Sequence, residues 1–218
     1  MERPERGADC IAAMSAAVDV PVTVKCRIGV DDQEPREVLP DFIGSVAEAG
    51  ASQVTVHARK AWLQGLSPKE TRDIPPLDYE LVYQMKRDFP DLMMSINGGI
   101  TTLQEAQKHL EAGMDGVMIG RAAYHSPAEI LLPADGIIFR DPGDQTAESA
   151  VLQMLPYIEA ELLKGAKLGQ MTRHMLGLFS GQPGARGWRQ VLSSKCHQPG
   201  AGPEVVLEAL ARVRPEAA

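Results

Sequence analysis

The chain has 218 residues, of which 44% are hydrophobic and 23% charged, a composition that predicts one globular domain, alone or with a small appendage. No apolar run reaches the roughly 18 residues needed to cross a bilayer, and no apolar segment follows the charges of "MERPERGADC", so we expect a cytoplasmic protein. The three cysteines form no CxxC pair, which argues against a zinc site, any other metal site of this kind and a disulfide framework.

The net charge of -7 argues against a nucleic-acid partner, but the charge is unevenly distributed. Residues 1–145 contain 14 Lys and Arg against 23 Asp and Glu, whereas residues 146–200 contain 6 against 3. The C-terminal part is therefore a locally basic unit on an acidic body.

Helix and strand patterns alternate from residue 8 to residue 121. Gly50 and Gly113 have the position of helix C-caps, and Thr102 with Glu105 has the spacing of a capping box. The predicted helices are 8–18, 40–49, 78–88 and 102–112, and the predicted strands lie within 20–29, 53–58, 91–99 and 115–121.

This alternation predicts a parallel sheet covered by helices, either an open doubly wound sheet or a (β/α)8 barrel. No GxGxxG motif follows a strand, which disfavours an open dinucleotide-binding sheet. Polar side chains end every strand, where barrels build their active sites. These side chains are Lys25, Arg27, His57, Arg59, Asn97 and Arg121.

Helical patterns without strands follow residue 145, at 146–164, 167–179, 184–194 and 203–213. The Pro, Gly and Asp content of 132–144 predicts a turn-rich connector before them. We therefore expect two domains: residues 1–140 form part of a barrel, and residues 141–218 form a small helical domain.

Two consecutive strand ends, Asn97-Gly98-Gly99 and Gly120-Arg121, have the composition of a phosphate site. Glycines allow backbone N–H groups to approach an anion, and an Arg supplies a cationic fork. The alternative is that the glycines serve tight turns and that Arg121 is solvated. Phosphate sites of barrels lie after the last two strands, which favours the phosphate interpretation.

Lys25 and His57 end neighbouring strands on the same predicted rim. Each could be explained alone, Lys25 as a surface charge and His57 as a structural side chain. Beside a phosphate site they indicate a shared ligand. A flavin fits, because a cation stabilises the negative charge of its reduced ring system.

Five segments resemble the tRNA-dihydrouridine synthases, specifically the A subfamily. They are "VTVKCRIGVDD", "VHARKAWLQGLSPKETRDIPPLDYELV", "MMSINGGITTLQEA", "DGVMIGRAAYHSP" and "TRHMLGLFSGQPGARGWRQVLS". The resemblance implies an FMN-containing (β/α)8 barrel with a C-terminal helical domain that binds tRNA. It also implies reduction of a D-loop uridine to 5,6-dihydrouridine with NADPH as the reductant.

The resemblance also implies roles for individual residues. Lys25 and His57 would contact the flavin, and Asn97, Gly98, Gly99, Gly120 and Arg121 would hold its phosphate. Lys69, Arg72, Arg186 and Arg189 resemble the cations that guide tRNA. Trp62 and Tyr124 are stacking platforms for bases or, equally, core or lid residues.

The chain departs from this family in one respect: only four of the eight barrel strands are predicted. The first four strands are absent, and with them the Asn-x-x-Cys-Pro loop that carries the catalytic acid. Cys26 follows Lys25 and so points to the other face of its strand. We therefore name no catalytic residue.

The chain is expected to be the C-terminal half of a synthase, from a truncated or mis-started gene. Alone it would be unstable, or it would pair with a separate N-terminal half or with a second copy. Two alternatives are a non-catalytic tRNA-binding remnant and another FMN-dependent barrel oxidoreductase.

Overall fold

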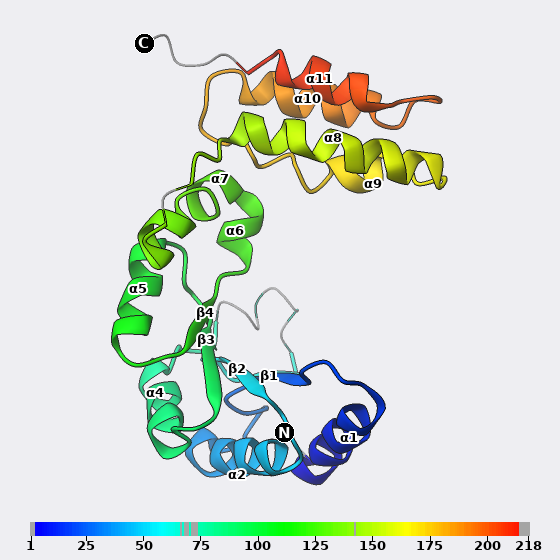
Figure 1. Ribbon diagram of the computed structural model, residues 1–218. Coiled ribbons are helices and arrows are strands. Elements are labelled where there is room, and N and C mark those ends of the chain that lie inside the picture. The colour runs from blue at the N-terminus through cyan, green and yellow to red at the C-terminus, as the bar shows by residue number, and fades with distance from the viewer. Residues whose placement is uncertain (1–2, 66, 68–69, 71–73, 142, 214–218) are drawn as a thin grey trace. The chain divides into compact units, whose positions relative to one another are not determined.

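The computed structural model describes residues 3–65, 67, 70, 74–141 and 143–213, and it divides into two compact units. Unit 1 is Met1–Ile119 and unit 2 is Gly120–Ala218 (Figure 1). We describe each unit by itself.

Unit 1 contains a four-stranded parallel sheet whose strands follow one another in chain order. The strands are β1 (Thr23–Arg27), β2 (Gln53–His57), β3 (Met93–Asn97) and β4 (Gly116–Met118). The helices are α1 (Pro4–Ala17), α2 (Pro35–Glu48), α4 (Tyr79–Asp88) and α5 (Leu103–Glu111). The predicted α/β class with a parallel sheet is confirmed.

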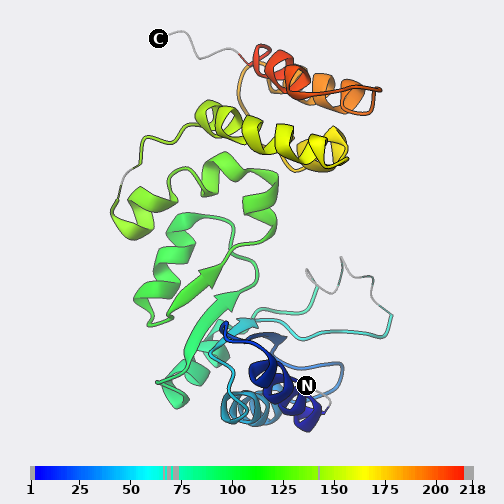
Figure 2. The same cartoon turned by 45° about the vertical axis from the view of Figure 1, so that its right-hand side comes forward.

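The core of unit 1 lies between one face of the sheet and its helices. Val54, Met94 and Ile96 are fully buried and share this face, because side chains two residues apart along a strand point the same way. Leu39 and Ile43 of α2 are also fully buried. Figure 2 shows α2 and α4 together along this side of the sheet. The other face of the sheet is thereby left to carry polar side chains.

The helix ends follow from local chemistry. The capping box is confirmed: the Thr102 hydroxyl accepts from the Glu105 N–H, and the Glu105 carboxylate accepts from the Thr102 N–H, both at 3.2 Å. Gly50 and Gly113 have positive φ values of 99° and 98°, as expected of C-caps.

The predicted start of the second helix was wrong. That helix, α2, begins at Pro35 rather than Pro40, and Pro40 lies inside it. The Glu34 side chain accepts from the backbone N–H of Arg36 at 3.2 Å, so the first turn is already capped upstream of Pro40. A proline inside a helix costs one helical hydrogen bond. Proline is also common at the first helical position, which is why the prediction started the helix at Pro40.

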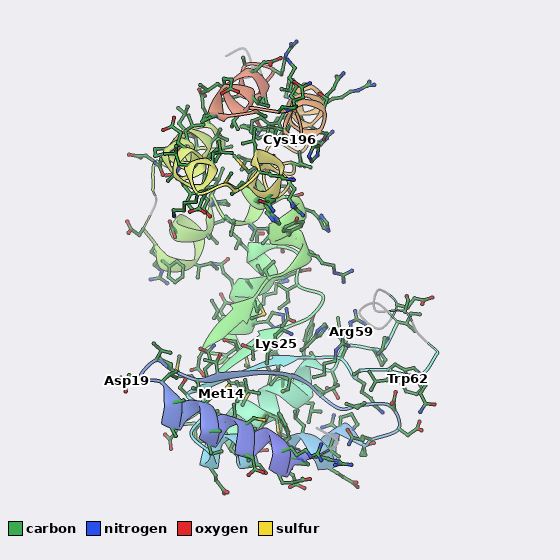
Figure 3. The ribbon with its side chains drawn as sticks, turned by 90° about the vertical axis from the view of Figure 1, so that its right-hand side faces the viewer. Met14, Asp19, Lys25, Arg59, Trp62 and Cys196 are labelled. Atoms are coloured by element: carbon green, nitrogen blue, oxygen red, sulfur yellow. The ribbon has the colours of Figure 1, made fainter. Side chains whose placement is uncertain are left out.

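Unit 2 is helical. Its elements are α6 (Arg121–His125), α7 (Pro127–Ile130), the π-helix η1 (Asp135–Phe139), α8 (Ala147–Leu163), α9 (Leu168–Thr172), α10 (Ala185–Lys195) and α11 (Pro203–Leu210). Trp188 is fully buried in the core of this unit, where its ring meets Phe179 edge to face at 4.9 Å. Figure 3 labels Cys196, another buried member of this core.

Two expectations for this region needed correction. The connector 132–144 is not only turns, since η1 lies within it, and the helix expected over 167–179 ends at Thr172. The predicted domain boundary after residue 140 lies inside unit 2, between η1 and α8. That residues 1–140 and residues 141–218 have different functions stays a prediction. Among the described residues, no helix combines the length and apolarity required to span a bilayer.

Candidate functional site

The face of the sheet opposite the core carries two rows of mostly polar side chains. Strand register aligns these rows across all four strands. The first row is Lys25, Thr55, Ser95 and Gly116, and the second, nearer the carboxyl ends, is Arg27, His57, Asn97 and Met118. The sequence identified Arg27, His57 and Asn97 of the second row by their strand-end positions, but it placed Arg121 at the end of the fourth strand, which ends at Met118. It also missed Thr55 and Ser95, which are buried.

Lys25 lies on this polar face in β1, as predicted. Although its side chain is exposed, desolvation by the surrounding protein lowers the pKa of its ammonium, and the charge of Arg27 lowers it further. Spacings of about 4.8 Å between strands and 3.3 Å along a strand put the Cα atoms of Lys25 and His57 about 8 Å apart. Lys25 and Arg59 are labelled in Figure 3, on the sheet side of α1 and α2.

Cys26 points to the opposite face, as its position after Lys25 predicted. It is aligned with Val56 and is buried in the core. Burial raises the pKa of the Cys26 thiol to about 12. Cys26 therefore does not belong to the polar face.

Gly98 has a φ of 113°, and a Cβ at this position would lie 2.6 Å from Cδ2 of His57. Gly99 has a φ of 71°, and its Cβ would lie 2.6 Å from Cδ1 of Leu77. Both glycines are therefore required by backbone conformation and by neighbouring side chains. The turn interpretation accounts for them without a ligand, while the phosphate interpretation stays a prediction.

Tyr79 supports this turn, a role that the sequence analysis did not predict. Its hydroxyl donates to the carbonyl oxygen of Gly98 at 2.6 Å. The Tyr79 ring meets His109 edge to face at 4.6 Å, and Nδ1 of His109 lies 2.7 Å from the Tyr83 hydroxyl. Desolvation lowers the pKa of the buried His109, because burial disfavours the charged imidazolium. Tyr79 is position N1 of α4, with no sequence motif to mark it.

The Asn97 side chain links two strands. Its Nδ2 donates to the carbonyl oxygen of Met118 at 2.7 Å, which ties the end of β3 to the end of β4. Asn97 therefore has a structural role, because its side chain connects the carboxyl ends of two neighbouring strands.

Gly120 and Arg121 begin unit 2, whereas Asn97, Gly98 and Gly99 belong to unit 1. The predicted phosphate cradle that joins the two groups stays a prediction. A Cβ on Gly120 would meet nothing within 4 Å, and its φ of -102° needs no glycine. Gly120 therefore leaves open space beside the first residue of α6.

The four predicted tRNA-guiding cations fall into two groups. Lys69 and Arg72 lie outside the described residues. Arg186 and Arg189 lie on α10 and are exposed, and the same helix buries Trp188 and Leu192. Their spacing of three residues places both guanidinium groups on one exposed side of the helix.

No group of three or more His, Cys, Asp or Glu side chains suited to a metal ion is found in the part of the chain that the structure describes.

The chain has a parallel sheet with cationic and amide side chains at its strand ends, followed by a helical unit with exposed arginines. These features define an α/β protein with a polar candidate site at the strand ends. The chain belongs to the dihydrouridine synthase (Dus) family, whose model matches residues 1–213.

The chain is similar to the tRNA-dihydrouridine(20/20a) synthase of Vibrio cholerae, with 56% identity over 215 residues, which are 98% of this chain and 65% of that protein. The protein of the same name from Salmonella typhi is 57% identical over 205 residues, 93% of this chain and 61% of its own length. The chain therefore spans less than two thirds of these relatives. A mandelate oxidase structure matches with 14% identity and a TM-score of 0.35 over 94% of this chain and 66% of its own, too weak a likeness to define the fold.

Proposed function

We propose that the chain is the C-terminal part of a flavin-dependent tRNA-dihydrouridine synthase of the A subfamily. The reaction is the reduction of D-loop uridines of tRNA at positions 20 and 20a to 5,6-dihydrouridine, with FMN as cofactor and NADPH as reductant. One observation carries the proposal: the Dus family match runs over residues 1–213, and the relatives that are more than half identical to this chain over the aligned residues are named tRNA-dihydrouridine(20/20a) synthases. A tRNA substrate also favours a cytoplasmic location.

We further propose that unit 1 supplies one half of a (β/α)8 barrel and that residues 141–218 form the tRNA-binding helical domain. The four parallel strands in chain order support this, since neighbouring barrel strands follow one another in sequence. Among the described residues, β1 and β4 each pair with one strand only, and in a closed barrel each would have a second neighbour.

The polar face of the sheet fits the chemistry of a flavin. Lys25 is exposed on this face and His57 is one row away, while desolvation lowers the pKa of the Lys25 ammonium. A cation and a ring nitrogen suit the polar edge of an isoalloxazine. Open space at Gly120 and the guanidinium of Arg121 suit a phosphate. When bound, the flavin would supply the hydride for the uracil ring.

The exposed side of α10 fits the backbone of tRNA. Arg186 and Arg189 have solvent-exposed side chains in the basic part of the chain. Contacts between arginine and phosphate position an RNA without reading its sequence. These two residues would therefore orient the substrate, and Lys25, His57 and Arg121 would bind the cofactor.

The first test is an absorbance spectrum of the purified chain from about 300 to 550 nm, where oxidised flavin absorbs. Bound flavin is the expected result. A colourless protein that binds tRNA would instead support the alternative of a non-catalytic tRNA-binding remnant. A yellow protein that does not bind tRNA would support another FMN-dependent oxidoreductase.

The division of labour is tested with Arg186→Ala and Arg121→Ala. We expect Arg186→Ala to weaken tRNA binding with little change in flavin content, and Arg121→Ala to do the reverse. Arg212→Ala is the matched control, because it removes one positive charge from unit 2 at a residue that already pairs with Glu208 at 3.7 Å. Equal loss of flavin and tRNA in both variants would refute the assignment.

A further inference from the structure

Three aromatic side chains, which we call the ring cluster, lie together on the surface of unit 2: Tyr124, His125 and His174. The Tyr124 ring centroid lies 5.5 Å from that of His125 and 5.9 Å from that of His174, at interplanar angles of 78° and 70°. The Tyr124 hydroxyl lies 3.0 Å from Nδ1 of His174, within hydrogen-bond distance. The cluster therefore combines edge-to-face ring contacts with one polar link.

The ring cluster is exposed, although aromatic rings usually contribute to stability through burial. Tyr124 is 52% exposed, and both histidines are exposed. The core of unit 2 is made by other residues, among them Trp188 and Phe179. Exposed rings of this kind are available to a ligand.

The backbone holds the ring cluster in one arrangement. A Cβ on Gly177 would lie 2.4 Å from the carbonyl oxygen of His125, so the segment after α9 approaches the end of α6 as closely as a glycine permits. The Ser180 hydroxyl donates to the same carbonyl oxygen at 3.5 Å. Tyr124 and His174 are 50 residues apart in sequence, and this packing brings them together before any ligand binds. A pre-formed surface loses little conformational entropy on binding.

The charge beside the ring cluster favours an anionic partner. Arg173 precedes His174 in the sequence and is exposed, and its Nε donates to the carbonyl oxygen of Gly169 at 3.2 Å. Residues 146–200 carry 6 Lys and Arg against 3 Asp and Glu, whereas the chain as a whole is acidic. Exposed rings in a segment rich in basic residues suit single-stranded nucleic acid, whose bases stack on aromatic rings and whose phosphates bind cations.

We propose that the ring cluster binds an unpaired base of RNA by stacking. This inference rests on the proposed tRNA substrate. It adds a base contact on α6 and the segment after α9 to the phosphate contacts expected on α10. An aromatic ring stacks with any base, so the cluster would recognise an unpaired nucleotide rather than a particular sequence.

The experiment compares Tyr124→Ala, Tyr124→Phe and Arg186→Ala for binding to unmodified tRNA over a range of salt concentrations. We expect Tyr124→Ala to weaken binding about tenfold, the order of one lost base stack, and Tyr124→Phe to bind almost as the wild type does. The salt slope of binding should be unchanged in both Tyr124 variants, because a stack releases no counterion. In Arg186→Ala the slope should become shallower by about one.

A second arm separates the base from the phosphate. The wild-type chain is titrated with an oligouridylate and with an oligonucleotide of the same length and charge that lacks bases. Preferential binding of the oligouridylate, lost in both Tyr124→Ala and His174→Ala, supports the inference. Equal binding of the two oligonucleotides, or unchanged tRNA affinity in Tyr124→Ala, overturns it.

The two proposals fail in different ways. If Tyr124→Ala binds tRNA normally while Arg186→Ala does not, the ring cluster has no role and the proposed function stands. If the wild-type chain does not bind tRNA at any salt concentration, the proposed function fails and this inference fails with it. The circular dichroism of each variant is the folding control, and Tyr124→Phe keeps the ring contacts should Tyr124→Ala not fold.

Discussion

At the scale of single residues, neighbours along β1 have opposite environments. Lys25 faces solvent and shares the polar face with Thr55, whereas Cys26 is buried among apolar side chains. The two-residue period of a strand predicts this from sequence. The environment of Gly98 was not predictable, because it depends on His57 and Leu77, which reach it through the tertiary fold.

The first prediction concerns Gly98. Gly98→Ala should lower the free energy of unfolding of unit 1 more than Gly113→Ala does, with each strained backbone costing about 1–3 kcal/mol. Both glycines have a positive φ, but a Cβ on Gly113 would meet nothing within 4 Å, whereas a Cβ on Gly98 would meet His57 at 2.6 Å. Urea titrations followed by far-UV circular dichroism measure the difference. Equal losses would show that the His57 ring moves aside without cost.

At the scale of elements, one carboxylate joins a helix to the sheet. Asp115 precedes β4, and its Oδ2 accepts from the backbone N–H of Met94 at 2.7 Å and pairs with the Lys86 ammonium of α4 at 2.8 Å. Burial acts to raise the pKa of Asp115, but the hydrogen bonds from Lys86 and Met94 outweigh it, and the net pKa is lowered. The ion pair therefore stabilises the folded state while Asp115 is ionised.

The second prediction follows from this linkage. Asp115→Asn should destabilise unit 1 by about 1–2 kcal/mol near pH 7, through the loss of charge-assisted hydrogen bonds. A carboxyl with a depressed pKa contributes stability above its unfolded pKa of about 3.9 and loses it as the pH falls through the folded value. The difference between wild type and variant should therefore shrink below about pH 4. Urea midpoints measured between pH 3 and pH 7 test this.

The matched control for Asp115 is the exposed pair Arg87 and Glu80 on α4, which lie 2.7 Å apart with side chains 60% and 67% exposed. Glu80→Gln should have a much smaller effect, since solvent screens the exposed charges. A similar loss in Glu80→Gln and Asp115→Asn would mean that net charge, rather than the link between α4 and the sheet, sets the stability.

At the scale of the whole molecule, the chain has two units with separate cores. The core of unit 2 is built from residues between Leu132 and Val213, and Trp188 lies fully buried within it. The second tryptophan, Trp62, belongs to unit 1 and is 36% exposed, with the Lys60 ammonium 5.8 Å from its ring centroid. Figure 3 labels it in the loop after β2. Each unit thus has its own fluorescent reporter.

The third prediction is that the two units unfold independently. In a Trp62→Phe background, fluorescence reports only Trp188, and adding Gly98→Ala should leave this transition unchanged while the circular dichroism transition of unit 1 moves to lower urea. Separate cores give separate cooperative units. A shift of the Trp188 midpoint by the same amount would show that the molecule unfolds as a single unit.

Features that depend on local chemistry were predictable from the order of the residues. Strand periodicity placed Lys25 and Cys26 on opposite faces, the spacing of Thr102 and Glu105 gave the start of α5, and the alternation of helices and strands predicted the parallel sheet. The family resemblance was also carried by sequence, and the match over residues 1–213 agrees with it.

Contacts between side chains that are far apart in the sequence follow only from the tertiary fold. Tyr79 reaches the carbonyl of Gly98, Asn97 bonds to Met118, and Tyr124 meets His174 from 50 positions away. Chain folding brings these groups together. The periodicity of the sequence does not predict such contacts, because it describes only the near neighbours of each residue. The polar face and the ring cluster are accordingly properties of packing, while the strands and helices that carry them are properties of the local sequence.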